Sequence, residues 1–139
     1  MHLVTGSTGY VGSVIVKKLL DSNLEVIGID KLISKVNLKY TSQNIELDIT
    51  KYKELENIFK TYKNIDCIYH CAAQLNFSKK NSDYFEKVNV TSTDILSDLA
   101  IKYGVKNFIY ISSNCVYGKI NSLNVSEDYP TRPFEEYGI

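Results

Sequence analysis

Short apolar runs rich in β-branched residues alternate along the chain with segments whose apolar residues recur at helical spacing. The apolar runs predict strands over residues 2–5, 25–29, 45–47, 66–71 and 106–113. The first run is short and continuous, which is typical of a strand buried on both faces of a sheet. The helical spacing predicts helices over residues 11–21, 51–62 and 82–103.

This alternation predicts an α/β fold built on a doubly wound parallel sheet, with the right-handed crossovers usual in such sheets. Residues 31–43 show no periodicity, and we expect a polar connection there with at most one helical turn. After Gly118 the sequence becomes loop-like, and a further helix is expected to begin near Phe134. We find no internal repeat, low-complexity tract or second domain, so residues 1–139 are predicted to form one domain.

Composition and charge narrow the classes of function. The 16 basic and 16 acidic side chains cancel, and Arg132 is the only arginine, so the basic stripe of a nucleic-acid-binding domain is not expected. No apolar run approaches the roughly 18 residues of a membrane span, and a core strand containing Leu3 leaves no room for a signal peptide. Three cysteines, Cys67, Cys71 and Cys115, form an odd, sparse set that favours reduced thiols in a cytoplasmic protein.

A glycine-rich segment, Thr5-Gly6-Ser7-Thr8-Gly9-Tyr10-Val11-Gly12, joins the first predicted strand to the first predicted helix. Gly6 allows a tight turn, Gly9 lets the backbone approach a pyrophosphate, and Gly12 lets the helix pack closely against the strand. The unpaired N–H groups and the positive end of the helix dipole then face the phosphates. This context predicts a dinucleotide-binding loop, and the alternative is a glycine-rich turn that serves packing alone.

Three further segments carry recognisable motifs. They are His70-Cys71-Ala72-Ala73, Ile111-Ser112-Ser113-Asn114-Cys115-Val116-Tyr117-Gly118, and residues 127–138, in which Pro130-Thr131-Arg132-Pro133 precedes Tyr137. Together with the glycine loop, these motifs resemble the extended short-chain dehydrogenase/reductase family, the NAD-dependent epimerases and dehydratases of sugar nucleotides. That family has a Rossmann sheet of about seven strands followed by a substrate-binding region. The resemblance covers the whole chain, which holds five strands and matches only the N-terminal portion of such an enzyme.

The resemblance implies NAD as the cofactor. Asp30 ends the second predicted strand, where a carboxylate can accept both adenosine ribose hydroxyls and repel a 2′-phosphate. Lys31 follows directly, and relatives that use NADP often carry basic residues near this position, so NADP is the less favoured alternative. Asp48 is expected to contact the adenine amino group, with a helix N-cap as its alternative role. The predicted cofactor-binding residues are Gly6, Thr8, Gly9, Tyr10, Val11, Gly12, Asp30, Asp48, Ile49, Cys71, Ala72 and Ala73.

The resemblance also implies a catalytic pair. Ser113, four residues before Tyr117, matches the strand-end Ser or Thr that hydrogen-bonds the reacting oxygen, with a turn cap as the alternative. Tyr137 matches the tyrosine of a Tyr-x-x-x-Lys motif and would act as general acid and base, its pKa lowered by that Lys. The Lys would be residue 141. The domain is therefore expected to end at the start of this helix, and the 139-residue chain to be inactive alone.

We therefore expect an epimerase-type enzyme that transfers a hydride between a sugar hydroxyl carbon and NAD, with a nucleotide sugar as its small-molecule substrate. Ser113-Asn114-Cys115 stands where the dehydratase branch has Thr-Asp-Glu, so the acid pair that eliminates water is absent. Two alternatives stay open: an NAD(P)-dependent reductase or dehydrogenase of a non-sugar carbonyl such as a steroid or flavonol, and a non-catalytic dinucleotide-binding or sensing protein. A homodimer of the full-length form is also left open.

No metal site is expected. Cys67, His70 and Cys71 are metal-ligand types, but strand alternation places the two cysteines on one face and the histidine on the other, without a fourth ligand. A structural histidine and two small buried thiols are the favoured interpretation.

Overall fold

The computed structural model describes residues 1–33, 43–75, 82–121 and 124–139, so most of the connection predicted for residues 31–43 lies outside the described part of the chain. In chain order the elements are β1 (His2–Thr5), α1 (Tyr10–Asp21), β2 (Val26–Asp30), β3 (Gln43–Glu46), α2 (Tyr52–Thr61), β4 (Cys67–His70), α3 (Ser82–Glu86), the π-helical segment η2 (Lys87–Thr91), α4 (Ser92–Lys102), β5 (Asn107–Tyr110) and the 3-10 turn η3 (Asn114–Tyr117).

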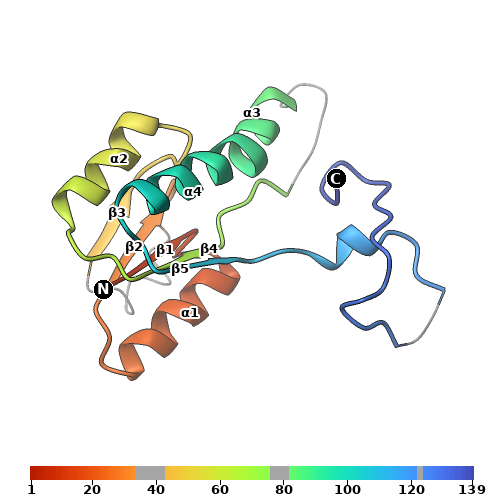
Figure 1. Cartoon of the computed structure of the whole chain (residues 1–139), viewed down its shortest axis with the longest axis horizontal. Coiled ribbons are helices and arrows are strands. Elements are labelled where there is room, and N and C mark those ends of the chain that lie inside the picture. Colours follow the sequence, from red (N-terminus) through yellow and green to blue (C-terminus); the bar gives the residue numbers. More distant parts are fainter. Residues whose placement is uncertain (34–42, 76–81, 122–123) are drawn as a thin grey trace.

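The five strands form one parallel sheet in the order β3-β2-β1-β4-β5. In β1, Leu3 lies opposite Ile27 of β2 on one side and opposite Ile68 of β4 on the other. Helix α1 covers one face of the sheet, whereas α2 and α4 cover the other (Figure 1). The predicted doubly wound parallel sheet is confirmed. Its strand order changes direction at β1, and ligands bind at the carboxyl ends of the strands at such a point.

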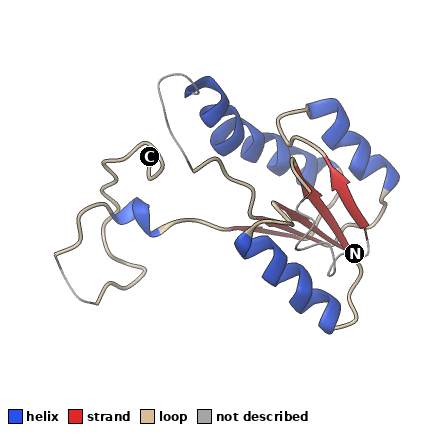
Figure 2. Ribbon diagram, turned by 180° about the vertical axis from the view of Figure 1, so that it is seen from behind, coloured by secondary structure: helices blue, strands red, loops and turns tan. Residues whose placement is uncertain are grey.

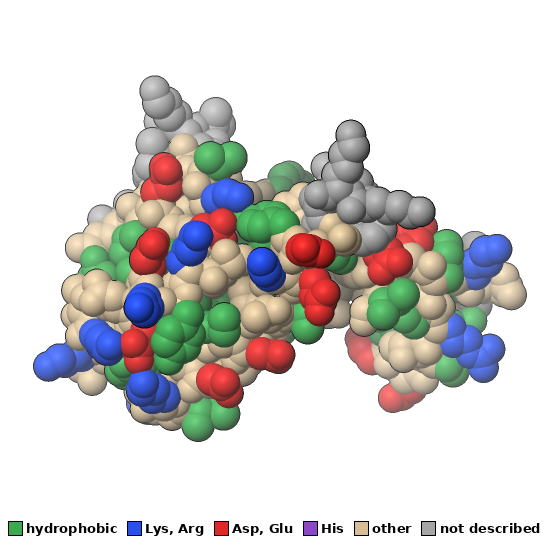
Figure 3. All heavy atoms as spheres, turned by 90° about the horizontal axis from the view of Figure 1, so that it is seen from above, with side chains coloured by type: hydrophobic (Ala, Val, Ile, Leu, Met, Phe, Trp, Pro, Cys, Tyr) green, Lys and Arg blue, Asp and Glu red, His purple; other side chains and the backbone are tan. Residues whose placement is uncertain are grey.

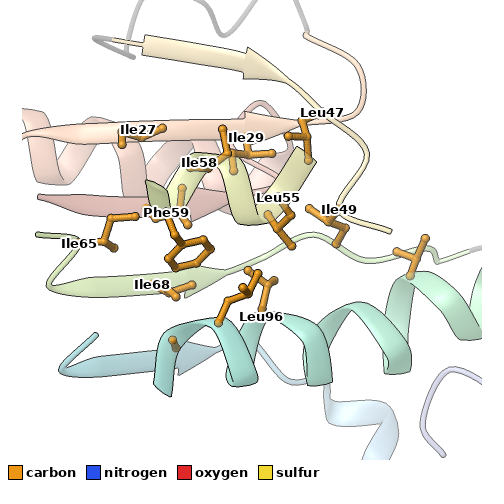
Figure 4. Close-up of a cluster of buried hydrophobic side chains, with 14 residues drawn as sticks. Ile27, Ile29, Leu47, Ile49, Leu55, Ile58, Phe59, Ile65, Ile68 and Leu96 are labelled. Carbon is orange, nitrogen blue, oxygen red and sulfur yellow. The ribbon is translucent and has the colours of Figure 1, made fainter. Parts of the chain in front are cut away.

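Both faces of the sheet are packed, because successive residues of a strand point to opposite sides. Leu3 belongs to the larger core cluster. Figure 4 shows this cluster between the sheet and helices α2 and α4. Its neighbour Val4 belongs to the smaller cluster, with Val16 and Leu19 of α1. Leu3 and Val4 are completely buried. This packing on two sides holds β1 firmly, and the strand delivers the glycine loop at its carboxyl end.

The helix predicted over residues 82–103 is one helical run whose middle is not α-helical. Segments α3 and α4 flank η2, in which the backbone follows the wider π geometry. Such single-turn π segments within α-helices are frequent at functional sites. Here η2 carries Asn89, whose side chain contacts the loop after β4.

Two predictions near the C-terminal end are wrong. The strand predicted over residues 106–113 ends at Tyr110. Its neighbour β4 ends at His70, whose carbonyl accepts from the N–H of Ile111, and no backbone bond between the two strands follows in the described part of the chain. In place of the helix expected from Phe134, residues 136–138 form a turn that the N–H of Gly138 closes on a carbonyl three residues earlier.

Beyond β5 the chain leaves the sheet and forms a small lobe (Figures 1 and 2). The backbone N–H of Arg132 donates to the carbonyl of Val116 at 3.0 Å and holds the lobe's two halves together. The lobe reaches back to α3, where the rings of Phe85 and Tyr137 meet edge to face with centroids 6.5 Å apart. This contact brings the C-terminal segment to the carboxyl edge of the sheet.

The surface carries charges of both signs. On the face shown in Figure 3, basic and acidic side chains are interspersed over the main body and the smaller lobe. None of the helices in the described part of the chain combines the length and the apolar character that a bilayer crossing requires.

Candidate functional site

A cavity of about 420 Å³ opens at the carboxyl ends of the strands. The glycine loop, the segments that follow β2, β3, β4 and β5, and the C-terminal lobe surround it. All the predicted site residues except Thr8 line this one cavity: Gly6, Gly9, Tyr10, Val11, Gly12, Asp30, Asp48, Ile49, Cys71, Ala72, Ala73, Ser113 and Tyr137. The structure therefore brings the predicted cofactor-binding and catalytic residues together.

Two glycines of the loop lie so close to other backbone that no side chain fits at their positions. Gly6 has a φ of 64°, and a Cβ there would lie 2.8 Å from the amide nitrogen of Ala72. A Cβ on Gly12 would overlap the carbonyl group of Gly6. Helix α1 starts at Tyr10, within the glycine-rich segment, with Gly9 as an N-cap that offers no side-chain hydrogen bond. The first turn of α1 therefore presents backbone N–H groups and a positive dipole end to the cavity, which suits a phosphate.

Thr8 lies behind the loop and fastens it to β2. Its backbone N–H donates to Oδ2 of Asp30 at 2.9 Å, and its hydroxyl lies 2.9 Å from both that oxygen and the carbonyl of Leu32 and can donate to either. The other oxygen of Asp30 accepts from the N–H of Leu32 at 3.3 Å. These bonds fix the carboxylate at the rim of the cavity, where its remaining lone pairs can accept hydrogen bonds from a ligand.

Asp48 follows β3, the neighbour of β2 in the sheet, and lines the same cavity as Asp30. Its Oδ1 accepts from the backbone N–H and the hydroxyl of Thr50, at 3.0 and 2.8 Å, while its Oδ2 accepts from the Tyr84 hydroxyl at 3.0 Å. Burial alone would raise the pKa of Asp48, but these hydrogen bonds and the charge of Lys31 together hold that pKa below its usual value. Asp48 therefore stays ionised and orders the turn before α2, although Lys51 and not Asp48 occupies the helix N-cap.

His70 is buried between two threonines at the centre of the sheet's carboxyl edge. Thr93 donates its only hydroxyl hydrogen to the carbonyl of Asn89 at 3.0 Å, so its oxygen must accept from Nε2 of His70 at 3.1 Å. Nδ1 is then the acceptor for the Thr5 hydroxyl at 2.6 Å, and the Thr5 oxygen accepts from the N–H of Ala72 at 3.2 Å. This network assigns the Nε2–H tautomer and ties the end of β1 to β4 and α4.

The loop after β4 is held by a second anchor. Oδ1 of Asn89 accepts from the N–H of Gln74 at 2.8 Å, and Nδ2 of Asn89 donates to the Gln74 carbonyl at 2.9 Å. The amide thus pairs with the loop backbone as a neighbouring strand would. Because Ala72 and Ala73 lie between His70 and Gln74, the two anchors fix the small residues that line the cavity.

Stability is expected to depend on pH through His70. Burial lowers the pKa of His70 to about 4, whereas an unfolded histidine titrates near 6.5. The neutral form of His70 therefore contributes its full stabilisation of the folded state above pH 6.5. As the pH falls from 6.5 towards 4, the histidine of the unfolded chain binds a proton first. This difference removes up to about 3 kcal/mol of the free energy of unfolding. Urea unfolding at pH 7.5, 6, 5 and 4 measures the loss.

A His70→Gln variant serves as the comparison. It is expected to be less stable at pH 7.5 because one hydrogen bond of the network is lost, but its stability should change little between pH 6.5 and 5. His2→Gln is the comparison at the other histidine. Burial and the N-terminal ammonium also lower the pKa of His2, but His2 is only half-buried, so this variant should reduce the pH slope by less. An unchanged pH slope in His70→Gln would assign the effect to other groups.

Ser113 and Tyr137 enter the cavity from the C-terminal side. The hydroxyl oxygen of Ser113 accepts from the N–H of Cys115 at 3.2 Å, so Ser113 caps η3 and keeps its hydroxyl hydrogen for a further acceptor. Burial raises the pKa of Tyr137, and negative charge on Tyr110 or Cys115 would raise it further. The phenol is thus protonated at neutral pH, which is the state of a general acid. A base function requires a nearby cation.

Metal-ligating side chains do not converge within the described ranges: no three His, Cys, Asp or Glu residues there are placed to share an ion. Cys67 and Cys71 are free thiols whose pKa burial raises, to about 11 for Cys71. Neutral thiols of this kind act as small packing groups.

The sequence did not single out Tyr84 or Gln74, although both line the cavity. Tyr84 acts on Asp48 and Lys31, which lie 36 and 53 positions earlier in the chain. This contact arises only when α3 meets the ends of β2 and β3. A tyrosine in the first turn of a helix that faces the carboxyl edge is the sole hint that the sequence offers.

Comparison with known proteins places this geometry in a family. Residues 2–139 match the model of the NAD dependent epimerase/dehydratase family. The chain is 35% identical over 144 residues to a putative UDP-glucose 4-epimerase of Methanocaldococcus jannaschii, covering 100% of this chain and 47% of that protein. The UDP-glucose 4-epimerase of Mycolicibacterium smegmatis is 31% identical, with 97% and 46% covered.

Solved structures agree. The UDP-glucose 4-epimerase of Thermotoga maritima, determined with UDP-glucose, superimposes with a TM-score of 0.89 at 31% identity and covers 99% of this chain and 46% of that protein. The Bordetella bronchiseptica enzyme WbmG, in complex with NAD and UDP, has a TM-score of 0.84 at 27% identity, with 99% and 45% covered. The resemblance drawn from the motifs is thus confirmed, and the chain spans less than half the length of these relatives.

Proposed function

The chain belongs to the NAD-dependent epimerase/dehydratase family, and on that premise we propose that residues 1–139 form the NAD-binding domain of a sugar-nucleotide epimerase. The observation that carries the proposal is that one cavity joins the glycine loop and Asp30 to Ser113 and Tyr137. Several similar proteins are UDP-glucose 4-epimerases, which supports a nucleotide sugar as the substrate class.

The residues around the cavity fit a dinucleotide. The uncapped first turn of α1 and the backbone of Gly6 and Gly9, which line the cavity, would hold the pyrophosphate through their N–H groups. Asp30 would accept the adenosine ribose hydroxyls, and Asp48 with Ile49 would border the adenine. NAD, when bound, would supply the centre that accepts a hydride from the sugar and returns it.

The protein's own part in the reaction is to move a proton and steady a charge. Tyr137 would remove the proton of a sugar hydroxyl as its carbon is oxidised, and return it when the carbon is reduced from the opposite face. Ser113 would donate the hydrogen that Cys115 leaves free to the oxygen that gains negative charge. Because burial raises the pKa of Tyr137, the phenol needs a cation to act as a base. We propose that the 139-residue chain, which has no residue 141, binds the cofactor but does not convert a sugar-nucleotide substrate.

Epimerisation is favoured over dehydration at this site. Elimination of water needs an acid and a base beside the leaving hydroxyl. Asn114 and Cys115 follow Ser113 in η3, and neither side chain is a carboxylic acid. The similar dTDP-D-glucose 4,6-dehydratase of Mus musculus, 30% identical with 97% of this chain and 41% of that protein covered, shows that both activities occur among the relatives.

Cofactor binding tests the proposal directly. The 139-residue chain is expected to bind NAD⁺, and to bind NADP⁺ at least about tenfold more weakly because the Asp30 carboxylate repels a 2′-phosphate. NAD⁺ at 100 times its dissociation constant should raise the free energy of unfolding by roughly 2.7 kcal/mol. Calorimetric titration and thermal unfolding with each nucleotide measure both effects.

Asp30→Asn is the matched variant, because the amide oxygen can still accept from Thr8 and the amide N–H can donate to a ribose hydroxyl. It should narrow the difference between the two cofactors while leaving NAD⁺ binding measurable. Equal shifts with both nucleotides in the unmodified chain would remove Asp30 from its role. No shift with either, in a folded protein, would refute the proposed function.

A further inference from the structure

Lys31 follows Asp30 directly in the chain, yet its ammonium is held elsewhere. Nζ of Lys31 donates to the Tyr84 hydroxyl at 2.7 Å and lies 3.5 Å from Oδ2 of Asp48. It also lies 4.2 Å from the centroid of the Tyr84 ring. The Tyr84 hydroxyl in turn donates to Asp48 at 3.0 Å. The ammonium thus donates to the phenol and the phenol donates to the carboxylate, so that each donor of this chain faces an acceptor.

Because Lys31 follows Asp30 directly, the orientation of its ammonium affects how a 2′-phosphate would be received at the ribose. The side chain is 55% exposed, and an unrestrained lysine is a flexible point charge that readily binds a phosphate. A cation beside the ribose would offset the repulsion between Asp30 and a 2′-phosphate. The negative charge that keeps NADP out would then be partly cancelled by the next residue in the chain.

We propose that Tyr84 and Asp48 hold Lys31 away from the ribose 2′ position, and that this restraint is a determinant of selectivity for the dinucleotide without a 2′-phosphate. The inference rests on the proposed cofactor site. It assigns Tyr84, on α3, a specificity role that acts through Lys31 and not through contact with the phosphate. The hydrogen bond from Lys31 to Tyr84 also raises the pKa of the lysine, so the ammonium keeps its charge throughout the neutral range.

The test is a cycle of variants in the Asp30→Asn background, where NADP⁺ binding is no longer suppressed by the carboxylate. The measured quantity is the ratio of the NADP⁺ and NAD⁺ dissociation constants, from calorimetric titration at low salt. Tyr84→Phe keeps the ring but removes the acceptor. It is expected to improve the ratio in favour of NADP⁺ by about threefold to tenfold, the range of one exposed to partly buried charge contact.

Lys31→Met completes the cycle. With Tyr84 intact it should leave the ratio within about twofold, since the lysine does not reach the phosphate. Added to Tyr84→Phe it should erase the gain, because the gain comes from an ammonium that has lost its 2.7 Å hydrogen bond to the Tyr84 hydroxyl. The gain should also shrink at about 0.5 M salt, which screens an exposed ammonium–phosphate contact. If Tyr84 had a purely structural role, Tyr84→Phe would weaken the binding of both nucleotides alike, and the effect would not depend on Lys31.

Tyr103→Phe is the matched control, because it makes the same chemical change at the far end of the molecule, where Tyr103 packs on Phe59. Circular dichroism confirms that each variant is folded. An unchanged ratio in Tyr84→Phe, or a gain that survives Lys31→Met, overturns the inference. Failure of the unmodified chain to bind either nucleotide instead refutes the proposed cofactor site, so the two failures are distinguishable.

Discussion

Substitution of Gly12 by alanine is expected to weaken NAD⁺ binding by this chain more than any other single change in the glycine loop. The new Cβ would overlap the carbonyl oxygen of Gly6 and lie 2.8 Å from its carbon and 3.1 Å from Cα of Ser7. All three atoms belong to backbone, so no side-chain rotation can relieve the contact, and either α1 or the loop must move. We expect NAD⁺ affinity to fall by more than about 100-fold, which corresponds to about 2.7 kcal/mol. Calorimetric titration measures the affinity.

Two other glycines provide the matched comparison. Gly104 has a φ of 70°, but a Cβ added there would meet no atom within 4 Å, so Gly104→Ala should destabilise the fold by about 1 kcal/mol and leave NAD⁺ affinity unchanged. Gly9→Ala meets only the Gly6 carbonyl oxygen, at 3.2 Å, and should have an intermediate effect on binding. Normal affinity in a folded Gly12→Ala would show that the loop does not hold the cofactor.

The fold could be predicted from the sequence where a local pattern and the tertiary environment agree. Leu3 and Val4 are apolar neighbours because β1 is buried on both faces, so its strand is evident from composition alone. The limits of β5 could not be predicted in this way, because they depend on where β4 ends. The π geometry at Asn89 has no mark in the sequence either. It is seen only in the backbone of η2, the segment from which the Asn89 side chain pairs with Gln74.

The candidate site likewise has features that a local sequence pattern predicts and features that depend on distant residues. The lining positions of the glycine loop and of Asp30 could be predicted, since a glycine pattern and a strand-end carboxylate are local features. Thr8 was included among the cofactor-binding residues, but in the structure it contacts Asp30 and not the cavity. The orientation of Lys31 could not be predicted, because a residue 53 positions away determines it. Sequence therefore indicates which residues gather at the edge of the sheet, and the structure adds which of them hold one another.

Substitution of Tyr137 by phenylalanine is expected to slow hydride transfer by roughly 10²-fold or more, as the loss of an acid/base group does. The measurement needs a polypeptide that continues past Ile139 with a lysine at position 141, because burial otherwise keeps the phenol protonated. Ser113→Ala should lower the rate by a similar factor through loss of the hydrogen bond to the developing oxyanion. NAD⁺ affinity should change little in either variant, so binding and chemistry separate.

Tyr117→Phe is the control for this pair. Tyr117 packs on Tyr129, with ring centroids 6.1 Å apart, and does not line the cavity that holds Ser113 and Tyr137. Its variant should keep the full rate. The 139-residue chain itself should show no turnover of a UDP-sugar above that of its own Tyr137→Phe variant. A full rate in Tyr137→Phe, with loss of rate in Tyr117→Phe, would move the catalytic role to the earlier tyrosine. Turnover by the 139 residues alone would mean that another group replaces the lysine as the cation beside Tyr137.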